Sequence, residues 1–147
     1  MRERHKKSDF EYANSVSGLT PEFLSVLESA MYDGRVDDVY SLTKTLHPAD
    51  LADLLEALTP EKRKDLVNVL RQDLNPDMIA ELDGSILGRV AEQLSAQEMA
   101  VAVARMETND AVDVVEDLRK QDQQEVLDAL PIGERILILE GLSYPKD

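Results

Sequence analysis

The chain has 147 residues, no cysteine and a formal net charge of −14. This length suits one domain with its own core, the lack of cysteine excludes disulfides and zinc–thiolate sites, and no apolar stretch approaches the roughly 18–20 residues that cross a bilayer. The first seven residues carry four of the 16 basic side chains, so residues 8–147 have a net charge of −17. Such a surface repels phosphate backbones, which argues against nucleic acid as a partner. Either the surface attracts cations and basic proteins, or its acidic residues only keep the domain soluble.

Helical periodicity begins after a leader of 18 residues, which we expect to be loose. The leader starts basic but has no apolar segment after its charges, so it does not match a secretion signal. Beyond it, apolar residues recur at positions i, i+3, i+4 and i+7, with Thr59-Pro60 and a Ser95–Glu98 capping box among the helix starts. The sequence predicts no strand, and it predicts helices over residues 21–32, 36–46, 48–58, 60–72, 76–82, 85–94, 96–106, 109–119, 121–130 and 132–142.

The apolar residues repeat with a period of 24. Leucines mark the period at Leu46, Leu70, Leu94, Leu118 and Leu142, and we expect these boundary leucines to be buried. Parallel columns run through Leu54, Met78, Ala102 and Val126, and through Leu55, Ile79, Val103 and Leu127. Each unit contains two helices that are too short to be stable alone, so the units must stack on one another. A fixed period turns that stacking into an all-α superhelix.

The sequence lacks the residue patterns of an enzyme. It has no glycine-rich phosphate loop and only two histidines, of which His47 precedes a proline and is best explained as a helix-start residue. The acidic segment 33–38 lacks the order of a calcium-binding loop, and we interpret it as a turn between helices. We therefore predict a domain that binds and regulates rather than catalyses.

Acidic residues occur in two kinds of position. Five are predicted in first turns of helices, where a carboxylate stabilises the positive helix end: Asp50, Glu61, Asp77, Glu98 and Asp122. In segment 108–118, by contrast, Asp110, Asp113 and Asp117 share one helix face, and only Arg119 and Lys120 at its far end could compensate them. This face is either simply solvated or receives a cation or a basic partner.

Three phrases resemble the N-terminal domain of MgtE-type magnesium transporters. They are the segment 46–61, which begins Leu-His-Pro-Ala-Asp-Leu, the segment Asn109-Asp110-Ala111-Val112-Asp113, and the ending Leu142-Ser143-Tyr144-Pro145-Lys146-Asp147. In that family a similar Tyr-Pro-x-Asp phrase leads into paired cystathionine-β-synthase-type (CBS) domains and then a membrane channel. The resemblance covers about residues 19–147.

The resemblance implies a right-handed superhelix over residues 19–142, followed by a linker at 143–147 toward CBS domains that the chain lacks. It implies a place on the cytoplasmic side of the plasma membrane, in a homodimeric multi-pass Mg²⁺ channel, with no membrane insertion of this part. Family members bind Mg²⁺ where this domain meets the CBS domains, and this favours the closed channel. The metal carboxylates then correspond to Asp77, Asp110 and Asp113, while position 109 is Asn where relatives can have Asp.

A second hypothesis needs no metal. The helical domains of the flagellar motor-switch protein FliG also use His-Pro-type helix starts and stacked short helices, and they bind other proteins. The residues that come after this domain in its parent gene distinguish the two hypotheses, because only a transporter continues into CBS domains and membrane helices.

Overall fold

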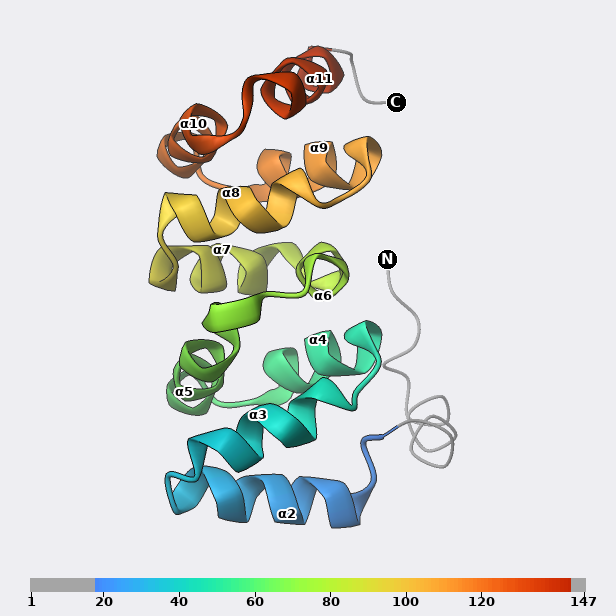
Figure 1. The fold of residues 1–147 in the computed structure, drawn as a ribbon, viewed down its shortest axis with the longest axis vertical. Coiled ribbons are helices and arrows are strands. Elements are labelled where there is room, and N and C mark those ends of the chain that lie inside the picture. Colours follow the sequence, from blue (N-terminus) through green and yellow to red (C-terminus); the bar gives the residue numbers. More distant parts are fainter. Residues whose placement is uncertain (1–17, 144–147) are drawn as a thin grey trace. The chain divides into compact units, whose positions relative to one another are not determined.

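The computed structural model describes residues 18–143, and within this range the chain is helical with no strand. Its α-helices are α2 (Pro21–Tyr32), α3 (Val36–Lys44), α4 (Pro48–Ala57), α5 (Pro60–Leu70), α6 (Pro76–Glu81), α7 (Gly84–Gln93), α8 (Ala96–Ala104), α9 (Thr108–Asp117), α10 (Lys120–Ala129) and α11 (Ile132–Leu142) (Figure 1). Every predicted helix is present, although the helix predicted over residues 60–72 ends at Leu70 and is followed by a 3₁₀ turn over Arg71–Asp73. The predicted leader and linker lie outside the described residues, apart from Gly18 and Ser143.

The helices begin where the sequence places N-caps. Ser95 and Glu98 form the predicted capping box at the start of α8. The Lys62 N–H donates to Thr59 Oγ1 at 3.3 Å in front of α5. His47 is a cap as well, because its Nδ1 accepts a hydrogen bond of 3.0 Å from the Ala49 N–H. These bonds satisfy backbone donors that no preceding helical turn can serve, and they explain why the helices are so short and so regularly spaced.

The chain divides into two compact units, residues 1–69 and 70–147. In the first unit α2 packs against α3 across a tight turn. Gly34 has a φ of +71°, the left-handed conformation that glycine adopts without strain. The Gly34 N–H donates to the Met31 carbonyl and the Arg35 N–H to the Ala30 carbonyl, at 3.1 and 2.9 Å, which is the Schellman pattern. The predicted helix–helix turn is therefore present over residues 33–35, whereas residues 36–38 of the predicted turn form the first turn of α3.

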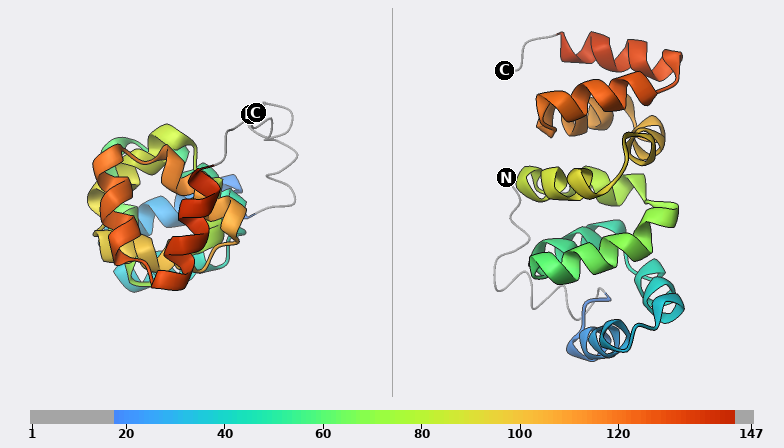
Figure 2. Two further views of the ribbon diagram at one scale, coloured as in Figure 1. Left: turned by 90° about the horizontal axis from the view of Figure 1, so that it is seen from above. Right: turned by 90° about the vertical axis from the view of Figure 1, so that its left-hand side faces the viewer.

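In the second unit, helices pack against the helix two further along the chain. α8 lies against α10 and α9 lies against α11, and α7 also packs against α9 (Figures 1 and 2). All eight members of the two parallel apolar columns predicted from the period, on α4, α6, α8 and α10, are at most 7% exposed. The 24-residue repeat is thus the period at which a helix pair meets the next pair.

The leucines that mark the period are buried at four of five positions. Leu46, Leu70, Leu94 and Leu118 are 4–7% exposed, as predicted. Leu142 is only half-buried, which corrects the prediction for the last position. The reason is that α11 is the last helix among residues 18–143, so no further described helix packs over its end.

Three connections between successive helices, α4–α5, α9–α10 and α10–α11, share a polar cap that the sequence did not predict. The fourth residue of a helix reaches back to carbonyls at the end of the preceding helix. Arg63 donates to the Leu55 and Leu58 carbonyls at 2.9 and 3.2 Å. Gln123 donates to Leu118 at 2.9 Å, and Arg135 to Leu130 at 2.9 Å. Each bond satisfies a carbonyl that the end of a helix leaves without an intrahelical partner.

Candidate metal-binding face

The acidic face lies on α9, and the opposite face of this helix is in the core. Ala111, Val114 and Val115 are buried. Asp113 and Asp117 are exposed, and Asp110 is half-buried. The helical period therefore places the carboxylates on the solvent side, as the sequence predicts.

The nearby cations do not compensate this face. The Arg119 guanidinium lies 3.1 Å from Asp122 on α10 and 3.5 Å from Glu92 on α7. Within residues 18–143, no ion pair includes the carboxylate of Asp110 or Asp113. The two like charges one helical turn apart therefore repel each other by a few tenths of a kcal/mol.

Asp117 has a structural explanation that the other two lack. A Cβ placed on Gly84, the first residue of α7, would lie 3.6 Å from Oδ2 of Asp117. The carboxylate thus lies beside the N-terminal turn of α7, whose partial positive charge stabilises an anion. This leaves Asp110 and Asp113 as the pair of α9 acids whose charge the described residues do not balance.

Asp77 lies in the first turn of α6, where the Asn75 side chain caps the helix by accepting from the Asp77 N–H at 2.8 Å. The Asp77 side chain is exposed, and α6 packs against α9. Even so, residues 18–143 contain no group of three or more acidic or histidine side chains that could hold a metal ion. Asp77, Asp110 and Asp113 therefore remain predicted ligands, and together they do not make a complete site.

The donor chemistry of Asp110 and Asp113 fits Mg²⁺. Carboxylate oxygens are hard ligands, and Mg²⁺ keeps several of its waters, so one or two carboxylates from one surface are sufficient on that side. Both residues lie on the solvent side of α9, three residues apart. Such a face can supply half of a shared site, and a second acidic surface would have to supply the rest.

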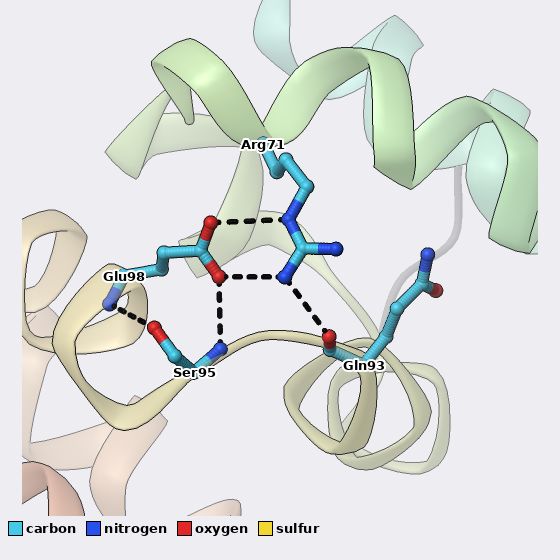
Figure 3. A network of polar contacts seen from close by, with 4 residues as sticks. All are labelled: Arg71, Gln93, Ser95 and Glu98. Atoms are coloured by element: carbon cyan, nitrogen blue, oxygen red, sulfur yellow. Dashed lines mark hydrogen bonds and ion pairs between the residues drawn. The ribbon is translucent and has the colours of Figure 1, made fainter.

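Sequence reasoning missed one polar network in the second unit (Figure 3). It assigned Glu98 to the α8 capping box, and this role is confirmed, since the Ser95 N–H donates to Glu98 Oε1 at 2.8 Å. In addition, the Arg71 guanidinium donates to both Glu98 oxygens, at 3.0 and 2.8 Å, and to the Gln93 carbonyl at 3.2 Å. The hydrogen bond from Arg71, helped by the bond from the Ser95 backbone, lowers the pKa of Glu98 to about 2.

This network provides a similar cap at the α7–α8 connection. The fourth residue of α8 is Met99, which cannot donate to the carbonyls at the end of α7. Arg71, 22 residues before Gln93, provides that donor instead, and Glu98 holds it in place. Because both carboxylate oxygens of Glu98 already accept hydrogen bonds from Arg71, Glu98 is not a candidate metal ligand.

No helix among residues 18–143 has the length and hydropathy needed to span a bilayer. The family described as "MgtE intracellular N domain" matches residues 46–147. The crystal structure of the soluble part of a magnesium transporter matches with a TM-score of 0.72 at 23% sequence identity. That match covers 85% of this chain and 50% of the other, so this chain spans about half the length of that structure. No curated protein sequence matches the chain.

Proposed function

The chain belongs to the family of MgtE intracellular N domains, and we propose that it senses Mg²⁺ and regulates a magnesium transporter on the cytoplasmic side of the plasma membrane. Family membership confirms the resemblance found in the sequence. This family is not enzymatic, which confirms the prediction that the chain is not an enzyme. The proposed parent is a homodimeric channel in which CBS domains follow this domain.

One observation carries the proposal: the half-buried Asp110 and the exposed Asp113 form an acidic pair on α9 that no ion pair balances within residues 18–143. Nearby acids have structural partners, as Asp117 has at α7 and Glu98 has at Arg71. An unbalanced pair costs stability in the isolated domain, and bound cations would remove that cost. This pattern favours a face that receives cations over one that is merely solvated.

The proposed mechanism rests on an incomplete site. Asp110 and Asp113, with Asp77 as the predicted third ligand, face an acidic surface of the CBS domains. Without cations the two surfaces repel, so the domains separate. With Mg²⁺ shared between them, the repulsion becomes attraction, and the population shifts toward the closed channel. The Mg²⁺ concentration at which this occurs depends on ligands from both surfaces.

The end of the repeat supports an attached partner domain. Val115 on α9 is fully buried, whereas Leu139, 24 residues later on α11, is 46% exposed. Ile132 and Ile136 lie on the same face of α11 and are exposed as well. Repeat proteins usually place a polar cap on a terminal unit. An apolar terminal helix therefore favours continued packing against a further domain.

The right-handed superhelix is part of the same proposal. The 24-residue period and the packing of α8 on α10 and of α9 on α11 support continued stacking in one direction. An experimental structure of the domain would test the handedness directly.

The test uses this domain joined to the CBS domains that we propose come after it. Small-angle scattering and protease protection of the connection would be measured across a Mg²⁺ titration. We expect compaction with increasing Mg²⁺, and we expect Asp110→Asn/Asp113→Asn to require more Mg²⁺ for the same compaction. The matched control is Glu22→Gln/Asp37→Asn, which removes two exposed first-turn acids from α2 and α3. The control should compact as the wild type does.

Equal Mg²⁺ dependence of the wild type and the α9 variant would show that Asp110 and Asp113 form only a solvated face. A parent gene without CBS domains would instead favour the metal-independent scaffold. In that case the acidic face of α9 should bind a basic protein surface in Mg²⁺-free buffer.

A further inference from the structure

A groove in the first unit has no part in the function proposed above. It has a volume of about 610 Å³ and opens to solvent between α2 and α5. Its lining consists of Ser25, Glu28, Ser29, Met31, Tyr32, Lys62 and Asp65. The groove thus combines carboxylates and hydroxyls with an aromatic ring and a thioether.

The chemistry of the lining suits a cationic side chain. Tyr32 is 92% exposed although it borders the groove, so its ring face is available. Within residues 18–143, no ion pair includes Glu28 or Asp65. Arginine and lysine pair with carboxylates and also stack on tyrosine rings. Lys62 is the one basic residue of the lining, so the groove carries a net negative charge.

We propose that this groove binds the basic segment formed by residues 1–7 of the same chain. That segment, Met-Arg-Glu-Arg-His-Lys-Lys, holds four of the chain's 16 basic residues and one acidic residue. It opposes the charge of the groove, and its arginines match both the carboxylates and the exposed ring of Tyr32. Residues 8–147 carry a net charge of −17, and their one run of three basic residues, 62–64, is flanked by Glu61 and Asp65.

The covalent connection permits this contact. Residues 8–17 join the basic segment to Gly18, and ten residues can span up to about 33 Å. α2 has 12 residues, so its whole length is about 18 Å. The groove residues of α2, Ser25 to Tyr32, therefore lie within reach. Because the contact is intramolecular, a short connection of this kind gives a high effective concentration, and a few weak charge contacts are sufficient.

The test exploits the absence of cysteine from the chain. Ser8→Cys provides a single attachment point for a nitroxide label beside the basic segment. Amide signals of the full chain would then be measured by NMR with the label paramagnetic and reduced. Outside the leader that carries the label, we expect the strongest broadening at Ser25–Tyr32 and at Lys62–Asp65, with weaker effects elsewhere among residues 18–143.

Two variants separate this contact from a general attraction between the segment and an acidic surface. Glu28→Gln/Asp65→Asn should reduce the broadening at the groove at least about twofold, and about 0.5 M NaCl should do the same because it screens the charges. The matched control Glu22→Gln/Asp37→Asn removes two acids of the same unit outside the groove and should leave the broadening unchanged. Circular dichroism confirms that each variant is folded.

Three results would overturn the proposal. They are broadening that is spread evenly over the acidic surface, broadening centred on Asp110 and Asp113, and groove broadening that survives in Glu28→Gln/Asp65→Asn. The second result would assign the basic segment to the candidate metal-binding face. This experiment does not test Mg²⁺ binding. Its failure would therefore leave the proposed function, which the Mg²⁺ titration of the two-domain protein tests, unaffected.

Discussion

The guanidinium of Arg71 donates to both carboxylate oxygens of Glu98, at 3.0 and 2.8 Å, across 27 residues of sequence. This fork-to-fork pair ties the 3₁₀ turn after α5 to the first turn of α8. It also occupies the one carboxylate with a strongly lowered pKa among the described residues. A shifted pKa is therefore no guide to the metal ligands in this domain, because here it reports a structural ion pair.

The pair predicts a specific pH dependence of stability. The pKa of Glu98 falls from 4.5 to about 2 on folding, so its contribution is present above pH 4.5 and is lost as the pH falls toward 2. Glu98→Gln keeps a capping-box residue but removes the charge. We expect the difference in unfolding free energy between wild type and Glu98→Gln to be largest near neutral pH and to shrink below pH 4.5.

Urea denaturation at several pH values measures this difference. Glu61→Gln is the control, since it removes another first-turn carboxylate, on α5, that forms no ion pair within residues 18–143. A difference for Glu98→Gln that stays constant from pH 7 to pH 2 would contradict the structural role of the pair. The effect should also weaken with added salt, because the two side chains are 35% and 30% exposed.

The difference in burial between Leu94 and Asp113 predicts that their substitutions have opposite effects on stability. Leu94 is 7% exposed between helix pairs, so Leu94→Ala should lower the unfolding free energy by about 2–5 kcal/mol. Asp113→Asn should be neutral or slightly stabilising, since it removes like-charge repulsion from an exposed position. Chemical denaturation ranks the two. The reverse order would make Asp113 a structural residue and remove it from the candidate ligands.

Close packing of α11 on α9 predicts a requirement for glycine at position 141. A Cβ there would lie 2.5 Å from Cγ2 of Val112, whereas a Cβ at Gly133 on the same helix would meet nothing within 4 Å. Gly141→Ala should therefore destabilise the domain by about 1–3 kcal/mol. Gly133→Ala should be neutral or stabilise by up to about 1 kcal/mol, because alanine has less conformational freedom to lose.

A double-mutant cycle tests the cause of this effect. Val112→Ala removes the atoms that the new Cβ would approach, so Gly141→Ala should cost less in that background than in the wild type. Thermal or chemical denaturation of the four proteins gives the coupling energy. Equal costs of Gly141→Ala in both backgrounds would place the strain elsewhere.

Much of the fold could be predicted because the helix-start residues and the 24-residue apolar repeat indicate the same helices. Prolines and capping side chains such as Thr59 and Ser95 fix the helix starts, and the apolar period fixes which faces are buried. Leu142 was predicted wrongly because its burial depends on whether another helix packs over the end of α11, which its position in the period does not reveal. The Arg71–Glu98 pair was missed because no local spacing connects residues 27 positions apart.

The candidate site was less predictable for a related reason. Helical spacing correctly placed Asp110 and Asp113 on one exposed face. It gave no sign that Asp117 lies beside the start of α7 or that Arg119 is held by Asp122. Those contacts decide which carboxylates lack a partner, and the contact of Asp117 depends on α7, a helix distant in sequence. The remaining ligands of the proposed site would come from the CBS domains that we propose follow this domain, so the residues of this domain alone do not specify them.

The isolated domain should bind Mg²⁺ weakly. Asp110 and Asp113 offer one side of a site, and residues 18–143 hold no group of three acidic or histidine side chains that could complete it. We expect a modest rise in melting temperature at millimolar Mg²⁺, because mass action links stability to a weakly occupied site. Asp110→Asn/Asp113→Asn should reduce that rise, whereas Glu22→Gln/Asp37→Asn should leave it unchanged. Calorimetric melting in Mg²⁺ and in matched NaCl measures the rise and separates binding from screening. A rise of equal size in both variants would mean that Mg²⁺ acts on the net charge of the domain and not on the α9 pair.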